Sequence, residues 1–235
     1  TWLETVVDDP AGFAPIAESV ARKSLKEKIR EVADNEVITE FSASVGDVIS
    51  GVVQQGRDES VIYVYLGGRT EGKIPLTEQV KGETFKHGDR IKAFVVKAEK
   101  GLKGPEITLS RTHPHLVRAL FALEVPEIKD RIVEVMGVAR EAGARSKISV
   151  RSHRGGVSPK GALIGPNGAR SRAVSDELFG EKIDIVDWSE DPAKYVASAL
   201  APARVSSVQL IDANTKSVKV VVPDFQLSLA IGKDG

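Results

Sequence analysis

Two short stretches with the same pattern decide the fold: LIGPNG at residues 163–168 and AIGKDG at residues 230–235. Both contain Ile-Gly-x-x-Gly, and they lie 67 positions apart. Glycine adopts positive φ angles and has no β-carbon, so another backbone can approach such a turn closely. A helix that begins after the turn directs free N–H groups and the positive end of its dipole outward. Each turn is therefore suited to hold phosphate groups.

A single Gly-x-x-Gly turn is a weak signal, because most such turns only connect two helices. Here the surrounding elements also repeat, which strengthens the signal. The second copy stops at its turn, so we expect exposed apolar surface there and a chain that is a fragment of a longer protein. The first copy is predicted to hold helix 113–125, strands 132–141 and 146–152, helical residues 159–176 and strand 181–188, and the second to hold helix 191–200, strands 205–212 and 217–224, and helix 226–232.

The stretch before the repeat, residues 46–110, has a pattern typical of β-strands. It contains five short β-rich runs separated by breaks that contain glycine. Five strands within about 65 residues fit a small closed barrel of the OB type. The runs are VISGVVQQ (48–55), SVIYVYLG (60–67), TEGKIP (70–75), RIKAFVVKAE (90–99) and EITLSR (106–111).

Two helices have apolar stripes at helical spacing. Residues 14–35 are predicted to form a helix with Pro15 in its first turn. Its stripe is expected to pack against another part of the protein. In the helix at 113–125, Leu116, Leu120 and Leu123 are expected to share the buried face. The stripe of the earlier helix consists of Ile16, Val20, Leu25, Ile29 and Val32.

Charge is unevenly distributed although the chain has 33 basic and 33 acidic residues. Within residues 140–172 there are eight basic residues and one acidic residue, Glu141, a local excess of +7. Charge effects reach about 10 Å at moderate salt, so a local excess can attract a polyanion although the whole chain is neutral. A solvated surface is the simpler explanation of such a segment.

Composition excludes several classes of protein. The chain has no cysteine, so disulfides and cysteine-ligated metal sites are absent, and a cytoplasmic location fits. No apolar run approaches the length of about 18 residues that a membrane span needs, and no signal peptide is visible. The first residue is not Met, so the natural start of the protein can lie further upstream.

No catalytic constellation stands out. Neither glycine turn has the spacing of a nucleotide-binding P-loop, and there is no G-x-S-x-G motif or cysteine nucleophile. His113 and His115 have metal-ligand spacing, but no third ligand lies nearby. We therefore expect no enzyme activity, no cofactor and no metal.

The barrel segment contains few aromatic residues on which a planar base could stack. Strand alternation places Tyr63 and Tyr65 on one face and Ile62 and Val64 on the other. Phe85 and Phe94 are further aromatic residues, and Phe94 is expected to fill the core. Lys73 in the third run is not aromatic, and each base stacked on an aromatic residue is worth roughly 1–3 kcal/mol.

The order helix–strand–strand–helix–GxxG–helix–strand resembles the KH domain in its bacterial (type II) topology, which clamps about four nucleotides of single-stranded RNA. The segment before it resembles the OB barrel of the ribosomal-protein-S-one class. A barrel followed by two KH units resembles the NusA family of bacterial transcription factors. The phrases THPHLVRALFALEVPEI, VAREAGARSKISV, GEKIDIVDW, DPAKYVASAL and VVPDFQLSLAIGKDG carry this resemblance.

The resemblance implies a multidomain chain with four parts. Residues 1–41 would be the end of an amino-terminal polymerase-binding domain with a linker helix, and residues 42–111 an all-β OB-fold barrel. Residues 112–188 would form the first KH unit and residues 189–235 a second, truncated one. It also implies binding of nascent RNA and RNA polymerase, contacts with other antitermination factors, and modulation of pausing, termination and antitermination.

The two turns, the basic segment and the barrel aromatics supply the predicted RNA-binding residues. Two alternatives remain: the RNA-binding part of a phosphorolytic RNA-degrading enzyme, which phosphate release would reveal, and a KH module that binds proteins, whose affinity would depend less on salt. The predicted residues are Ile164, Gly165, Pro166, Asn167, Gly168, Arg170 and Arg172 at the first turn, Arg145, Lys147, Arg151 and Lys160 in the basic segment, Ile231, Gly232, Lys233 and Gly235 at the second turn, and Tyr63 and Tyr65 on the barrel.

Overall fold

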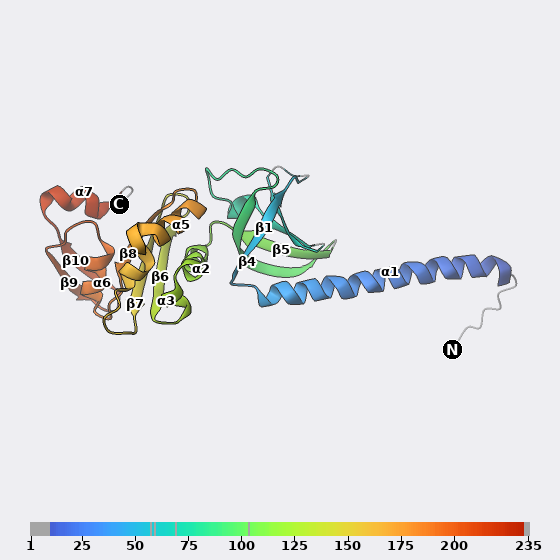
Figure 1. Ribbon diagram of the computed structural model, residues 1–235, viewed down its shortest axis with the longest axis horizontal. Helices are drawn as coiled ribbons and strands as arrows, with labels where there is room; N and C mark the ends of the chain where they lie inside the picture. The colour runs from blue at the N-terminus through green and yellow to red at the C-terminus, as the bar shows by residue number, and fades with distance from the viewer. Residues whose placement is uncertain (1–9, 57, 59, 69, 103, 233–235) are drawn as a thin grey trace.

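The computed structural model describes residues 10–232 except 57, 59, 69 and 103. It is an elongated molecule in which a long helix, a barrel and two mixed α/β units follow one another in chain order (Figure 1). This arrangement confirms the predicted fold class. None of the helices in the described ranges combines the length and the apolar character that crossing a bilayer requires.

Helix α1 spans Pro10–Ala43, so it is longer at both ends than the predicted range of 14–35. Pro15 consequently lies inside the helix and not in its first turn. The prediction that the apolar stripe packs against another element is wrong for the described residues, because Ile16 and Leu25 are 62% and 63% exposed. Only the carboxyl-terminal turns are covered, where Phe41 enters the barrel core. The other stripe residues, Val20, Ile29 and Val32, are exposed as well.

The barrel is a closed sheet of five strands in the order β1-β2-β3-β5-β4. Neighbouring strands are antiparallel except β3 and β5, which run parallel. Gly72 is needed for closure, since a β-carbon there would come within 2.6 Å of the buried side chain of Leu109. The strands are β1 (Val48–Gln54), β2 (Ile62–Gly67), β3 (Thr70–Ile74), β4 (Arg90–Gly101) and β5 (Gly104–Ser110), with a short 3-10 helix, η1 (Leu76–Glu78), after β3.

The first KH unit packs its helices, α2 to α5, on one face of a three-stranded sheet in the order β6-β7-β8. Strands β7 and β8 are parallel, as the type II topology requires. Phe121 takes the core position expected for Leu123, which is 64% exposed. The elements are α2 (Pro114–Glu124), α3 (Pro126–Lys129), β6 (Val133–Glu141), β7 (Arg145–Ser152), α4 (Pro159–Ile164), η2 (Pro166–Gly168), α5 (Ala169–Glu177) and β8 (Lys182–Asp187).

The second KH unit repeats the same order of elements up to its glycine turn. Its only buried residue in the described range 189–232 is Ala203. Phe225 is 80% exposed and Ile211 is 67% exposed, so the expected apolar surface is present. The elements are α6 (Pro192–Ala199), β9 (Ser207–Asp212), β10 (Ser217–Val221), η3 (Asp224–Gln226) and α7 (Leu227–Ile231).

The barrel and the first KH unit share one buried junction. Phe94 from β4 belongs to the hydrophobic core of the KH unit, which confirms its predicted role in the core. Its ring stacks on His113 with a centroid distance of 4.1 Å and an interplanar angle of 5°. The Nδ1 atom of His113 in turn accepts the backbone N–H of His115 and caps α2. Burial, followed by the neighbouring His115, lowers the pKa of His113 below its ordinary value.

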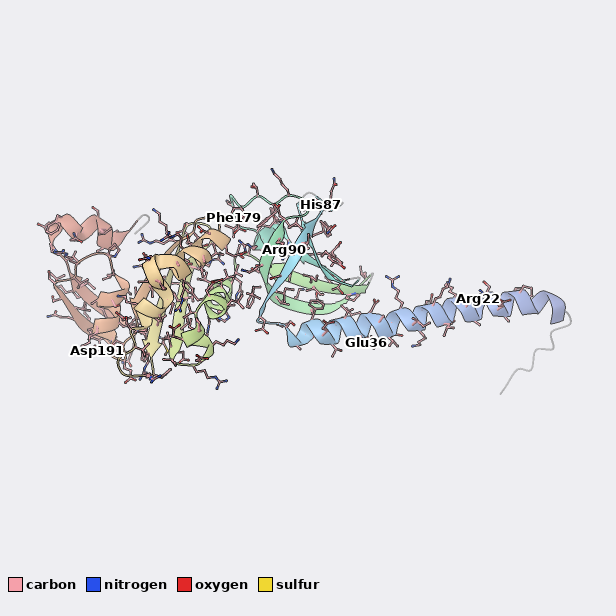
Figure 2. All side chains as sticks on the ribbon, in the orientation of Figure 1. Arg22, Glu36, His87, Arg90, Phe179 and Asp191 are labelled. Carbon is pink, nitrogen blue, oxygen red and sulfur yellow. The ribbon has the colours of Figure 1, made fainter. Side chains whose placement is uncertain are left out.

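Arg111 joins the two domains through a fully buried guanidinium group. It makes two hydrogen bonds to the carboxylate of Glu83, at 2.8 and 2.5 Å. It also donates to the backbone carbonyl oxygens of Lys92 in β4 and Glu177 in α5, both at 2.8 Å. Nearby, Phe179 (labelled in Figure 2) meets Phe85 edge to face at 5.1 Å. These contacts hold the barrel and the first KH unit in one fixed orientation.

Candidate nucleic-acid interface

The first glycine turn connects α4 to α5 through three residues with positive φ. Gly165 ends α4 with φ 70° and ψ 177°, and its N–H donates to Gly161 O at 2.9 Å. Asn167 and Gly168 follow with φ 51° and 76° in the left-handed region, which Asn and Gly tolerate best. No side chain caps the first turn of α5. The N–H groups of Gly168 and Ala169 already donate to the carbonyl oxygens of Gly165 (3.1 Å) and Pro166, so an anion at this helix start would have to be held by the other N–H groups of the turn and by the helix dipole.

The second turn begins in the same conformation. Gly232 has φ 83° and ψ −168°, and its N–H donates to Ser228 O at 3.1 Å, four residues earlier, as Gly165 does to Gly161. Ile164 and Ile231, which precede the two glycines, are 42% and 54% exposed. The repeat seen in the sequence thus extends to backbone angles and to exposure. The predicted contacts Lys233 and Gly235 lie outside the described residues.

Arg170 and Arg172 follow the first turn but have different surroundings. Arg170 donates to the carboxylate of Glu127 at 2.8 Å and to Ala162 O at 2.7 Å. Arg172 is exposed and donates to the carbonyl oxygen of Asn167 at 2.6 Å. Arg172 consequently lies at the edge of the turn with donors available for a phosphate, whereas Arg170 holds α3, α4 and α5 together. Pro166 and Asn167 are exposed at the tip of the turn.

The basic segment is far less positive in the structure than in the sequence, because its partners come from outside residues 140–172. Five of the eight basic side chains form ion pairs with such residues. Arg140 and Glu181 are both fully buried, with 2.8 Å between Nη2 and Oε2. The other pairs are Arg145–Asp184 (2.6 Å), Arg151–Glu190 (3.0 Å), Lys160–Asp187 (3.1 Å) and Arg170–Glu127 (2.8 Å).

Three of the predicted contacts lie on the back of the first KH sheet. Side chains alternate along β7, so Ile148 and Val150 face the helices in the core while Arg145, Lys147 and Arg151 face the other side. The turn at residues 165–168 is carried by the helices on the front face. The structure therefore does not bring these three residues together with the first glycine turn.

On the barrel, the alternation along β2 is confirmed: Val64 is buried and Tyr65 is 43% exposed. Tyr63 is half-buried and its ring covers Gly56. The position that lacks an aromatic residue, Lys73, forms an ion pair with Glu106 at 3.5 Å. One exposed tyrosine is a modest platform for stacking a base.

The linker between the KH units has a helix cap and a cation–π contact. Asp191 caps α6 by accepting the N–H of Ala193 at 3.0 Å. Trp188 was not among the predicted contacts, and the guanidinium of Arg151 lies 4.9 Å from its ring centroid. Near Trp188 the sequence has acidic residues such as Asp187 and Glu190, and Arg151 comes much earlier in the chain, so no local pattern indicates this pair. Within the described residues, no three His, Asp or Glu side chains gather as metal ligands would.

Comparisons with known proteins agree with this architecture. Residues 111–188 match a family model described as "NusA-like first KH domain", residues 192–235 match "NusA-like second KH domain", and residues 42–110 match "S1 RNA binding domain". The transcription termination/antitermination protein NusA of Mycobacterium tuberculosis is 51% identical over 234 residues, which cover 97% of this chain and 67% of that protein. The NusA proteins of Bacillus subtilis and Thermus thermophilus are 47% and 40% identical, with 60% and 58% of their lengths covered.

Proposed function

This chain belongs to the NusA family of transcription termination/antitermination proteins, and we propose that it binds nascent single-stranded RNA through its two glycine turns. The observation that carries the proposal is the matched pair Gly165 and Gly232, which end the corresponding helices α4 and α7 of the two units in similar backbone conformations. Each turn would present N–H groups to phosphates, while the apolar residue before it, Ile164 or Ile231, would contact a base.

Family membership removes the phosphorolytic enzyme from consideration, because the relatives are transcription factors and not enzymes. The RNA-binding surface we propose centres on residues 164–172 and 231–235, with Arg172 and Lys160 at its edges. Tyr63 and Tyr65 would add a weak contact on the barrel, since only Tyr65 is well exposed. Arg145 and Arg151 would add positive electrostatic potential on the back of the first KH sheet and would not contact RNA at the turns.

The remaining partners follow from the family. RNA polymerase and other antitermination factors would bind the protein, and residues 1–41 would belong to the polymerase-binding part. Residues 42–111, 112–188 and 189–235 would be the barrel and the two KH units that read RNA. Bound to polymerase in the bacterial cytoplasm, the chain would modulate pausing, termination and antitermination.

The test is a titration of the chain with fluorescent RNA, single-stranded or duplex, at two salt concentrations. We expect tighter binding of the single strand, because unpaired bases fit beside the turns. The affinity should fall steeply between about 50 mM and about 200 mM salt, since each phosphate contact on a single strand contributes about 0.7 to the slope of log K against log salt. Equal affinity for both forms, or no dependence on salt, would favour a protein-binding KH module instead.

A further inference from the structure

The sheet of the first KH unit has a second buried face that its own core does not explain. Ser149 in β7 and Val186 in β8 are each 3% exposed, yet neither belongs to the hydrophobic core formed with α2, α4 and α5. They are paired neighbours in the sheet and so point to the same side, together with Lys147. Some other element must cover this side.

That element is α6 of the second KH unit, which packs against β8 (Figure 1). Ser198 Oγ in α6 accepts the backbone N–H of Asp187 at 3.0 Å. Tyr195 reaches further across the sheet, since a β-carbon placed on Gly137 in β6 would lie 3.9 Å from its hydroxyl oxygen. The second KH unit is therefore docked on the back of the first, in addition to being connected by the linker.

Lys147 lies at the centre of this joint. Its ammonium group donates to the carbonyl oxygens of Ala199 and Ala201, the latter at 2.8 Å. Ala199 is the last residue of α6 and Ala201 follows its cap, Leu200, so the ammonium group lies at the helix end where backbone acceptors lack partners within the helix and the dipole favours a cation. Burial is the main reason why the pKa of Lys147 lies below its ordinary value. The ammonium group of Lys147 is therefore used in binding the end of α6.

We propose that Lys147 is a positioning residue that fixes the second KH unit on the first, so that the two glycine turns form one continuous path for RNA. To contact a phosphate, Lys147 would have to leave two half-buried carbonyl oxygens without a donor, which costs free energy. The inference rests on the proposed RNA binding, but the joint itself is testable without RNA.

The first experiment measures backbone ¹⁵N relaxation of the whole chain without RNA. Lys147→Met keeps most of the apolar stem and removes the ammonium group. We expect the second KH unit to tumble faster than the first in this variant and together with it in the parent chain. Arg145→Met is the matched control, because it removes the same charge from the same face but pairs only with Asp184. Unchanged relaxation in Lys147→Met would overturn the proposal.

A second variant covers the case in which Lys147→Met fails to fold, as judged by circular dichroism. Ser198→Ala removes the acceptor of the Asp187 N–H from the opposite side of the same joint. We expect a smaller loosening in the same direction. If the two units still tumble together in this variant, the polar contacts of α6 do not hold the joint and the proposal is wrong.

The second experiment uses RNA of two lengths: about four nucleotides, which one KH unit clamps, and about ten, which reach both turns. In Lys147→Met, affinity for the longer RNA should fall roughly tenfold while affinity for the short RNA stays the same, because the advantage of linked sites depends on their geometry. An equal loss for both lengths, with a salt slope lower by about 0.7, would make Lys147 a direct phosphate contact and overturn the positioning role. If the parent chain binds neither RNA, the proposed function fails. The relaxation experiment still shows whether Lys147 fixes the second KH unit on the first.

Discussion

The side chain of Arg170 lies directly over the α-carbon of Gly165. A β-carbon built on Gly165 would approach Arg170 Cγ to 2.6 Å, whereas one built on Gly168 would meet only the guanidinium of Arg172 at 3.5 Å. The two glycines of the first turn therefore have different constraints. Gly165 is required by both its φ angle and the packing of Arg170, and Gly168 only by its φ angle.

Gly168→Asp should weaken RNA binding roughly tenfold or more, because a carboxylate would face the phosphates that we propose the turn holds. Asp tolerates the left-handed region better than most residues, so the fold should persist. Gly168→Asn is the control: it has the same shape without the charge and should lose much less affinity. The measurement is fluorescence anisotropy with single-stranded RNA, with circular dichroism to check folding. Equal affinities of both variants and the parent would show that the turn is only a connection between helices.

Arg172→Met and Arg170→Met should separate binding from folding. Arg172 has no acidic partner among the described residues, so its replacement should lower the salt slope of RNA binding by about 0.7 and leave stability nearly unchanged. Arg170 is tied to Glu127 and Ala162, so its replacement should lower the free energy of unfolding by about 1–3 kcal/mol. Urea unfolding and RNA titration of both variants provide the measurements. The opposite pattern would reverse the two roles.

Glu181→Gln should destabilise the protein in a pH-dependent way. Burial by itself would raise the pKa of Glu181, but hydrogen bonds from Arg140, Ser146 and the Gly143 N–H outweigh it and hold the pKa below its ordinary value of 4.5. A carboxyl group with a lowered pKa in the folded state stabilises the fold above pH 4.5, and this contribution is lost as the pH falls through the folded pKa.

The variant should therefore lose about 3–5 kcal/mol at about pH 7, because it leaves the Arg140 charge buried and unpaired, and the difference from the parent should shrink below pH 4.5. Urea unfolding at neutral and acid pH measures this. Asp184→Asn, in the partly exposed pair with Arg145, is the control and should change stability by less than about 1 kcal/mol. A pH-independent difference for Glu181→Gln would contradict the role of its charge.

Phe94→Ala should destabilise the barrel and the first KH unit together, by about 3–5 kcal/mol. The residue belongs to a barrel strand but fills the KH core, so the two domains should still unfold in one transition. Phe225→Ala, at an 80% exposed position, should change stability by no more than about 0.5 kcal/mol. Differential scanning calorimetry tests both expectations, and separate transitions in the parent chain would argue against a fixed junction.

Local pattern was sufficient to predict most of the fold. Alternation along residues 60–67 correctly placed Val64 inside and Tyr65 outside the barrel, because a strand alternates its faces whatever surrounds it. Helical periodicity was less decisive, since a stripe shows that a face is apolar but not that a partner covers it. This is why the exposed stripe of α1 was expected to be packed, and why Leu123 was expected in place of Phe121.

At the candidate site, local sequence pattern did not predict the contacts between residues that are distant in the chain. The basic segment looked unopposed because its carboxylates, such as Glu181 and Asp184, follow later in the chain and meet it only in the folded sheet. Likewise, the contact of Lys147 with two backbone carbonyl oxygens of the second KH unit could not be predicted, because it depends on how the two units pack. The glycine turns were predictable because their geometry depends on the glycines themselves.

The length of α1 has a mechanical consequence. At 1.5 Å per residue its 34 residues form a rod about 50 Å long, anchored at one end by Phe41 in the barrel. Since the barrel is in turn fixed to the first KH unit by Arg111, a force applied near the far end of the rod would act on the RNA-reading units through a lever and not through a flexible tether.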